Sequence, residues 1–150
     1  MHAPDGYDCP FCRIAAGHLP GRVVLRDAHV MALVNIRWWP NNPGGCLVVP
    51  LEHFENVYDL PPALGTPIQA AVQRLARALK EAVRCDGVST RQHNEPAGNQ
   101  DVWHYHVHVF PRFHNDGLYA RDTEWAWASA DAMHDHANRL RAAWPTHEVP

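Results

Sequence analysis

The alternation of apolar and polar positions predicts short strands in the first third of the chain and a long helix after them. Apolar runs over residues 22–27, 30–35 and 46–50 are separated by turn-forming residues, which is typical of strands. From Ile68 to Val83, apolar residues recur at spacings of three and four, which predicts an amphipathic helix with one buried face.

Residues at both ends of this helix favour its start and its exit. Thr66 can cap the helix, Pro67 suits its first position, and Gln69 completes a capping box with Thr66. Gly87 suits the exit. We therefore expect the helix to lie between Thr66 and Gly87.

The second half of the chain predicts two more strands and a second helix. Residues 87–92 and 103–110 are the expected strands, and a helix is expected from about Ser129, which can cap it, to Trp144. The order of strands, helix, strands and helix predicts an α+β domain. Its antiparallel sheet has about five strands, with one long central helix and a C-terminal helix.

The chain of 150 residues is long enough to form one domain with a substantial core, and no internal repeat divides it. We expect a single domain over residues 1–150, with a loose N-terminal end at 1–8 and a C-terminal extension over about 115–150. Residues 37–45 are rich in turn formers and are expected to be a loop.

Charge and composition exclude some classes of partner. The formal net charge is −3, from 13 Lys and Arg against 16 Asp and Glu, which argues against broad binding to nucleic acid or to an anionic membrane. No stretch approaches the length of a membrane span and no apolar leader follows Met1, so we expect a cytoplasmic protein. Histidine is abundant, with 12 residues, and it can supply metal ligands, nucleophiles and acid–base groups.

The most unusual stretch is WHYHVHVFPRF, residues 103–113, in which every second residue from 104 to 108 is histidine. Alternate side chains of a strand share one face, so His104, His106 and His108 are expected to point the same way. The residues between them are better candidates for the core: Tyr105, Val107 and Val109. A half-exposed strand whose polar face happens to be histidine would also explain the triplet alone.

The loop before this strand, residues 93–102, can offer amides and backbone N–H groups to an anion. Together with the histidines it resembles the histidine triad (HIT) family of nucleotide hydrolases and transferases. The family motif, His-φ-His-φ-His-φ-φ with φ apolar, stands here at residues 104–110. The segments CPFCRIAAG, ALVNI, CLVVPLEHFEN, NEPAG and PR fall in the family's order. The resemblance therefore runs from about Cys9 to Arg112 and implies a HIT-like fold.

The resemblance implies that His106, the middle histidine, attacks the α-phosphorus of a nucleotide and forms a nucleotidyl–imidazole intermediate, which water then hydrolyses. Imidazole suits this task because it is largely neutral at pH 7 and nucleophilic, and a carbonyl bonded to its other nitrogen would fix the tautomer. His108 would contact the phosphate and assist proton transfer at the leaving group. Gln100 would hold phosphate oxygens, together with the backbone of residues 98–101.

The nucleotide-binding set that the resemblance implies is Asn35, Ile36, Asn94, Gly98, Asn99, Gln100, Asp101 and His108. Asn35 and Ile36 match the family's ribose and base contacts, and Asn94 matches an amide on the phosphate side. His108 favours the hydrolase branches, because the sugar-phosphate nucleotidylyltransferase branch has glutamine at that position. A purine nucleotide and a second copy of the chain, in a homodimer, are the implied partners.

Cys9 and Cys12 have the C-x-x-C spacing of half a zinc site, although a redox pair or two buried thiols would have the same spacing. The zinc-bearing branch of the resembled family completes the site with a histidine after the third strand and the first histidine of the triad. Here these are His53 and His104. The resemblance thus implies a closed, four-coordinate and structural Zn²⁺ site. Without a metal, His53 would be a surface residue.

Some positions depart from the pattern of the resembled family. Gly45 stands where many members carry the histidine of a PGH sequence. Asp101 stands where many carry serine or threonine; since a carboxylate repels phosphate, we expect it to turn away or to contact a cationic part of the substrate. Three placements are open for Trp38 and Trp39: they could line the base pocket, cover a dimer surface or pack on their own loop. Most histidines outside the triad and the metal set, including His136, are expected at the surface.

Three hypotheses of function follow. The first is a phosphohydrolase that cleaves at the α-phosphate of a dinucleoside polyphosphate, a nucleoside phosphoramidate or a related adenylylated compound, with a nucleotidyltransferase or phosphorylase of the same family as its variant. The second is a nucleotide-binding module with weak or lost catalysis. The third is a zinc-containing interaction domain that binds no nucleotide.

Overall fold

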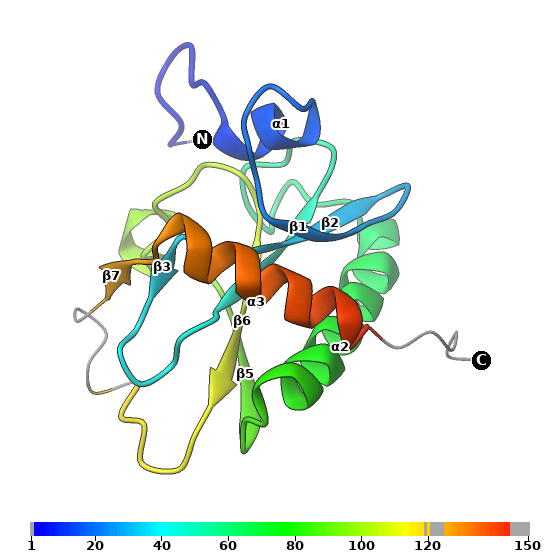
Figure 1. Ribbon diagram of the computed structural model, residues 1–150. Helices are drawn as coiled ribbons and strands as arrows, with labels where there is room; N and C mark the ends of the chain where they lie inside the picture. Colours follow the sequence, from blue (N-terminus) through cyan, green and yellow to red (C-terminus); the bar gives the residue numbers. More distant parts are fainter. Residues whose placement is uncertain (1, 119, 121–124, 145–150) are drawn as a thin grey trace.

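The structure is a computed structural model that describes residues 2–118, 120 and 125–144. Its helices and 3-10 turns are α1 (Pro10–Ala15), η1 (Pro62–Leu64), α2 (Gly65–Val83), η2 (Pro96–Gly98) and α3 (Ala130–Ala142). Its strands are β1 (Val23–Arg26), β2 (Val30–Val34), β3 (Arg37–Trp38), β4 (Cys46–Pro50), β5 (Gly87–Gln92), β6 (Val107–Arg112) and β7 (Ala126–Trp127). Figure 1 shows their arrangement.

Five strands form one antiparallel sheet in the order β1-β2-β4-β6-β5. This sheet, with the long helix α2 and the C-terminal helix α3, confirms the predicted α+β fold. β3 and β7 form a separate two-stranded sheet, so the predicted loop at residues 37–45 contains one short strand. Its partner β7 comes from the C-terminal part of the chain, which the local sequence around β3 does not indicate.

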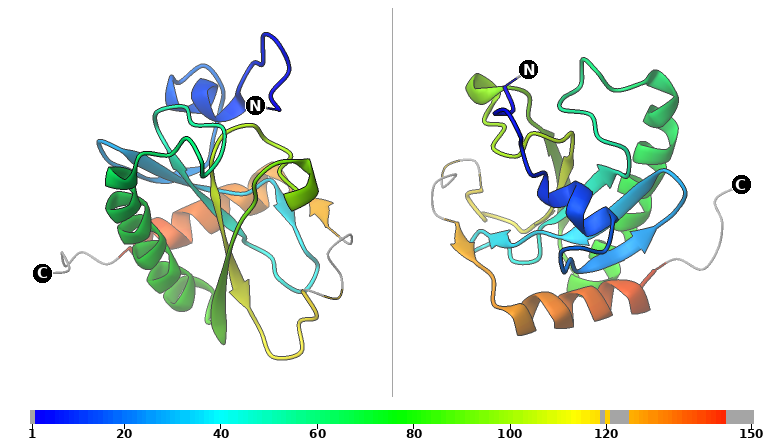
Figure 2. Two further views of the ribbon diagram at one scale, coloured as in Figure 1. Left: turned by 180° about the vertical axis from the view of Figure 1, so that it is seen from behind. Right: turned by 90° about the horizontal axis from the view of Figure 1, so that it is seen from above.

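The two faces of the five-stranded sheet carry different elements. Because successive side chains of a strand point to opposite faces, Ala32 and Val34 join the larger core with α2 and α3, whereas Met31 and Leu33 pack toward α1. α1 lies apart from the two long helices (Figures 1 and 2). The helices of the larger core thus leave the other face free to carry a site.

The buried stripe of α2 confirms the predicted helical spacing. Its buried residues are Ile68, Ala71, Val72, Leu75, Ala78 and Leu79. The predicted ends were wrong. η1 leads directly into the helix, so that Leu64 stands at the N-cap without a side-chain hydrogen bond and Thr66 lies inside α2. Arg84, with a left-handed φ of 54°, ends the helix, and Gly87 begins β5.

The histidine strand starts later than predicted. β6 begins at Val107, because β4 pairs with it only as far as Val48 and the preceding backbone bonds elsewhere. The N–H of Tyr105 donates to the carbonyl of Phe54, at 2.6 Å. Tyr105, Val107 and Val109 are buried in the larger core as predicted, while Phe110 is buried on the other side of the strand.

The C-terminal helix confirms its prediction closely. The Ser129 hydroxyl caps α3 by accepting from the N–H of Ala132, at 3.1 Å. Residues 2–8, expected to be a loose end, form no helix or strand. They do contact the domain, since the Glu55 carboxylate accepts from the N–H of His2, at 2.6 Å. Within the described part of the chain, no helix has the length and apolar character needed to cross a membrane.

Candidate functional site

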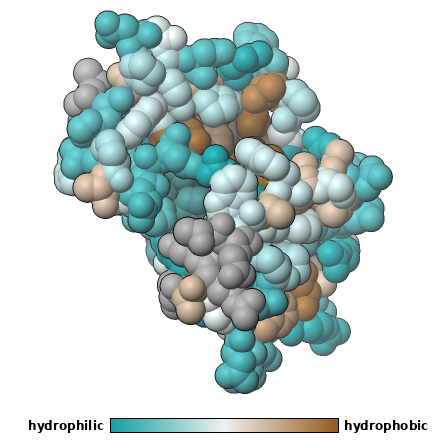
Figure 3. Space-filling view, turned by 90° about the vertical axis from the view of Figure 1, so that its left-hand side faces the viewer, coloured by the Kyte–Doolittle hydropathy of each residue, from teal (hydrophilic) through white to brown (hydrophobic). Residues whose placement is uncertain are grey.

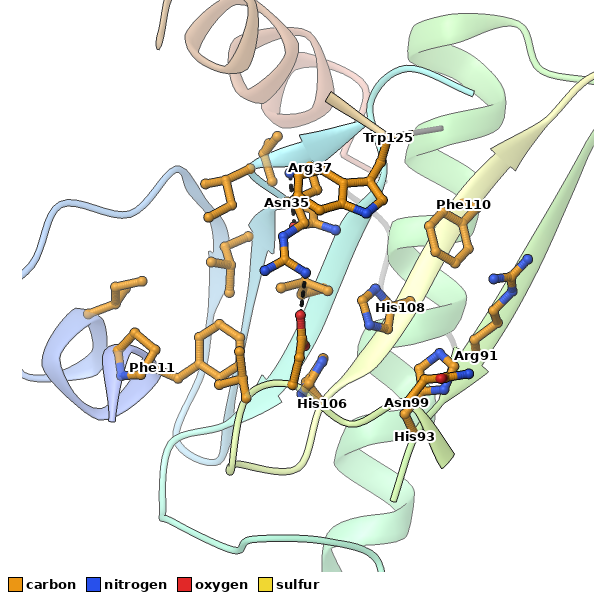
Figure 4. Close-up of a pocket in the computed structure, with 18 of the residues that line it drawn as sticks. Phe11, Asn35, Arg37, Arg91, His93, Asn99, His106, His108, Phe110 and Trp125 are labelled. Carbon is orange, nitrogen blue, oxygen red and sulfur yellow. Dashed lines mark hydrogen bonds and ion pairs between the residues drawn. The ribbon is translucent and has the colours of Figure 1, made fainter. Parts of the chain in front are cut away.

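A cavity of about 430 Å³ lies on the face of the sheet that carries α1. One wall is apolar: its residues are Pro10, Phe11, Ile14, Leu19, Pro20, Leu33 and Leu47. The other end is polar and carries Arg91, His93, Asn99 and His108. Figure 4 shows Phe11 on one side and Arg91, His93 and Asn99 on the other, with His106 between them. The surface in Figure 3 is mostly hydrophilic, with apolar side chains visible in a recess.

His106 is held in one tautomer inside this cavity. Its side chain is buried, and its Nδ1 lies 2.8 Å from the carbonyl oxygen of His104. A carbonyl only accepts, so Nδ1 carries the hydrogen and Nε2 keeps the lone pair. Burial lowers the pKa of His106, which favours the neutral ring. The arrangement therefore provides an imidazole in its nucleophilic form.

His108 lies beside His106, with ring centroids 4.8 Å apart, and stacks on Phe110 at 5.5 Å. Burial lowers the pKa of His108 well below its usual value, and the charges of neighbouring histidines and arginines lower it further. Its Nδ1 is buried and has no hydrogen-bond partner within the described residues. A buried polar atom of this kind is available for a ligand in the cavity.

In the loop before the triad, some residues line the cavity and others hold the loop in place. Asn99 and Asp101 are the predicted loop residues that line the cavity. Asn35 and Ile36, which follow β2, also line it. Gln100 is buried, and its amide donates to the carbonyls of Glu55 and Val102, at 2.6 and 3.1 Å, and accepts from the N–H of Glu95, at 2.8 Å.

Gln100 is thus not among the residues that line the cavity, and neither are Gly98 and Asn94. The amide oxygen of Asn94 accepts from the N–H of Val57, at 2.8 Å, and its nitrogen donates to Gln92, at 2.7 Å. Asn99, in a left-handed conformation with φ of 66°, is the loop amide that reaches the cavity.

Asp101 is paired with a cation of the chain itself. Its carboxylate forms an ion pair with Arg37 of β3, drawn as a dashed line in Figure 4. The Arg37 guanidinium also lies over Trp125, 4.6 Å from the ring centroid. Asp101 was expected to turn away or to contact a cationic part of the substrate; instead it lines the cavity and pairs with an arginine of the protein, so its negative charge there is compensated.

Sequence reasoning missed three polar residues that line the cavity: Arg37, Arg91 and His93. Arg91 is opposite His108 in the register of β5 and β6, which the sequence of either strand does not give. Arg37 and Trp125 meet through the pairing of β3 and β7. The strand expected at residues 87–92 does place Arg91 on one of its two alternating faces, and this is the one sequence signal that could have singled out Arg91.

The packing shows where Trp38 and Trp39 lie and what surrounds Gly45. Trp39 lines the cavity, whereas Trp38 packs against the larger core. A Cβ at Gly45 would lie 3.3 Å from the Phe110 ring, so Phe110 limits the room for a side chain there.

His136 was expected at the surface, and that prediction was wrong. It is 1% exposed, because α3 turns this side of the helix into the larger core. Its Nε2 lies 2.9 Å from the carbonyl oxygen of Gly44, and burial lowers its pKa to about 4. His136 therefore binds the backbone beside Gly45 from behind the sheet.

Four side chains gather beside the cavity in a cluster that could hold a metal ion: Cys9, Cys12, His53 and His104. Their ligand atoms all lie within 4.8 Å of one another. Sγ of Cys9 and Nδ1 of His104 are 3.3 Å apart, as are Sγ of Cys12 and Nδ1 of His53. A tetrahedral site with bonds of about 2.0–2.3 Å has edges of roughly 3.3–3.8 Å, so these spacings fit one.

The surroundings of His104 favour metal binding through Nδ1. Its Nε2 lies 3.0 Å from the carbonyl oxygen of Pro50, so Nε2 carries the hydrogen and Nδ1 offers its lone pair to the cluster. Burial, followed by the charge of His53, lowers the pKa of His104 to about 4, which keeps the ring in the neutral form that ligates.

Comparison with known proteins agrees with this geometry. A family model described as HIT domain matches residues 16–115. The Bacillus subtilis protein named Protein hit is 36% identical over 113 residues, which are 75% of each chain. A Bartonella henselae Hit-like protein superposes with a TM-score of 0.80 at 30% identity, covering 95% of this chain and 99% of that one.

Other relatives carry more specific names. A zinc-bound histidine triad family protein of Mycobacterium smegmatis has a TM-score of 0.76 at 31% identity, over 91% of this chain and 92% of that one. An Arabidopsis thaliana adenylylsulfatase is 26% identical over 77% of this chain and 58% of its own. A Saccharomyces cerevisiae adenosine 5'-monophosphoramidase is 29% identical over 75% of this chain and 68% of its own.

Proposed function

This chain belongs to the HIT domain family, and on that premise we propose that it is a phosphohydrolase that cleaves nucleotides at the α-phosphate. One observation carries the proposal: His106 is buried in the cavity with Nδ1 bonded to the His104 carbonyl, which leaves Nε2 as the nucleophile. The names of an adenylylsulfatase and a monophosphoramidase among its relatives support the same class of reaction.

The reaction proceeds in two displacements. Nε2 of His106 attacks the α-phosphorus while the bond from phosphorus to the leaving group breaks, and the electron pair departs with the leaving group. An N–H of His108 donates to the bridging atom as it leaves. Water then attacks the nucleotidyl–imidazole, which releases a nucleoside monophosphate and restores His106.

The apolar wall takes the base and the loop takes the phosphate. A purine ring packs against Phe11 and Ile14, with Asn35 and Ile36 at the ribose. Asn99 and backbone N–H groups of residues 98–101 bind phosphate oxygens as charge develops. Gln100 contributes by bracing this loop, since its amide bonds join the loop to the carbonyls of Glu55 and Val102.

We propose Zn²⁺ as the ion of the Cys9, Cys12, His53 and His104 cluster. Two thiolates and two imidazoles in a closed set of four suit zinc and leave no open position, so the ion would supply structure rather than Lewis-acid chemistry. It would fasten α1, and with it one wall of the cavity, to the segment that leads into β6. We also propose a homodimer, which light scattering on the purified protein would test.

A panel of nucleotides tests the hydrolase function. The purified protein is incubated with diadenosine tetraphosphate, diadenosine triphosphate, adenosine 5'-phosphoramidate, adenylyl sulfate and the guanosine counterparts of the first three, and the products are separated by chromatography. We expect AMP or GMP from the wild type and from His134→Ala, an exposed histidine of α3, and none from His106→Ala. Equal rates for the wild type and His106→Ala would overturn the mechanism.

Two features favour a nucleotide-binding module with weak catalysis as the second candidate. Gly45 replaces the usual family histidine beside the Phe110 ring, and Asp101 brings a carboxylate into the phosphate loop. Tight binding of AMP without turnover of any compound in the panel would select this candidate over the hydrolase.

A further inference from the structure

The polar end of the cavity holds two groups that the proposed reaction has not used, Arg91 and His93, beside Asn99 of the phosphate loop. Arg91 lies in β5, one residue before the strand ends, and the β5–β6 register puts it opposite His108. Arg91, His93 and Asn99 lie together on the side of His108 that faces away from the apolar wall (Figure 4). Nδ1 of His93 donates to the carbonyl of Gly98, at 2.6 Å, which fixes this ring against the loop.

Arg91 brings a positive charge to this end of the cavity. Of the described residues that line the cavity, Asp101 is the single acid, and Arg37 pairs with it. Burial lowers the pKa of His108 most, and the charge of Arg91 is among the causes that lower it further. The electrostatic field of Arg91 therefore reaches His108, the residue proposed to donate to the leaving group.

The order of groups along the cavity sets the direction of a bound nucleotide. The base lies against the wall at Phe11, and His106 must face the α-phosphorus. Whatever is attached to that phosphorus on the far side reaches toward Arg91 and Asn99. The polar end is therefore the subsite of the leaving group.

We propose that Arg91 and Asn99 bind this leaving group and select a tetrahedral oxyanion, as in a phosphate chain or a sulfate, over a neutral amine; the inference rests on the proposed hydrolase function. A guanidinium matches the geometry of such an anion, and the Asn99 amide adds a neutral donor. When the phosphorus–oxygen bond breaks, its electron pair stays on the leaving oxygen. The guanidinium stabilises the charge that grows there.

The test compares the ratio of kcat/KM for an anionic and a neutral leaving group. The anionic substrates are diadenosine tetraphosphate and adenylyl sulfate, and the neutral one is adenosine 5'-phosphoramidate. We expect Arg91→Gln to lower this ratio by about 10- to 100-fold, since a hydrogen bond to a charged group is lost. Arg91→Lys should retain part of it. Arg77→Gln, which removes an exposed arginine of α2, is the matched control.

Asn99→Asp provides a second variant at an exposed position where Asp tolerates the left-handed backbone. Its added negative charge should lower the same ratio. An equal loss for both anionic substrates assigns the subsite to oxyanions in general, and a loss confined to the tetraphosphate assigns it to phosphate chains. If both variants kept the wild-type ratio, the subsite would be rejected while the hydrolase stood. If the wild type cleaved none of the three, the hydrolase itself would fail.

Discussion

Phe11 packs edge-on against His106, with ring centroids 5.3 Å apart. Phe11 also lies between Cys9 and Cys12, at the start of the six-residue helix α1. The same short segment therefore supplies two atoms of the metal cluster and part of the apolar wall. One aromatic ring therefore connects the segment that carries the two cysteines to the His106 imidazole.

Removal of the proposed Zn²⁺ from the Cys9, Cys12, His53 and His104 cluster should weaken nucleotide binding and lower the stability of the fold. A helix of six residues such as α1 is not stable without tertiary contacts or a bound ion. An ion bound only to the folded state stabilises it by mass action, so EDTA should lower the melting temperature by roughly 5–10 °C. The affinity for AMP should fall several-fold. Thermal melts and calorimetric titration with AMP measure the two effects.

Cys12→Ser is the control for this experiment. It should reproduce both losses, and EDTA should then change neither the melting temperature nor the affinity further. Unchanged binding of AMP after loss of the metal would separate the cluster from the nucleotide site.

The Arg37–Asp101 pair should control rates more than stability. Both side chains are partly exposed, so the pair contributes at most about 1 kcal/mol to folding. Asp101→Ser removes a carboxylate from the phosphate loop and releases Arg37, so kcat/KM for nucleotide substrates should rise about 3- to 10-fold. Arg37→Gln leaves Asp101 uncompensated and should lower it to a similar degree. Steady-state kinetics at two ionic strengths measures both, and equal rates in all three proteins would exclude any electrostatic role for the pair.

Asp116 should stabilise the fold except in acid. Its carboxylate accepts from Arg112 at 2.6 and 2.8 Å, from Asn42 at 2.7 Å, and from the N–H groups of Phe113 and Leu118 at 3.0 and 3.1 Å. The Arg112 hydrogen bonds hold the pKa of Asp116 well below its usual range. The stabilisation is thus present above the unfolded pKa of about 3.9 and is lost as the pH falls below it.

We expect Asp116→Asn to reduce the free energy of unfolding by roughly 3 kcal/mol at pH 7, because it removes a buried carboxylate from its ion pair with the half-buried Arg112. The deficit relative to the wild type should shrink as the pH falls below 4. Urea unfolding at pH 7 and at pH 3 measures the difference, and a deficit of the same size at both values would contradict the assignment.

The contribution of His136 to stability should change with pH in a higher range than that of Asp116. Burial lowers its pKa to about 4, so the folded protein keeps it neutral while the unfolded chain takes up a proton below about 6.5. Its stabilisation is present above pH 6.5 and is lost as the pH falls toward 4, by roughly 3 kcal/mol over that window.

His136→Gln should remove this part of the pH dependence while His134→Gln, at an exposed position of the same helix, should not. Urea unfolding at pH 7 and pH 4.5 measures the slope. If His136→Gln fell with pH as steeply as the wild type, another group would be responsible.

Periodicity was sufficient to predict the strands and both long helices, because it is a local property of the sequence. The C-x-x-C spacing indicated Cys9 and Cys12, whereas His53 and His104 came from the resemblance to the HIT family. The sequence could not predict that Arg91 faces His108, since strand register depends on which strands pair. It gave no sign of α1, whose six residues are stable only through their tertiary contacts. Gln100 bonds to the 51–56 loop, and that contact also lies outside any sequence pattern.

The cavity is lined by Pro10 and Phe11 of α1 and by Trp125, which lies next to β7 and far from α1 in the sequence. A contact between such distant positions carries the entropic cost of closing a long loop. During synthesis, a ribosome-bound chain that has not yet extruded Trp125 lacks one side of the cavity. Nucleotide would therefore find a complete cavity only after Trp125 has left the ribosome, and it could not assist the stages of folding before that point.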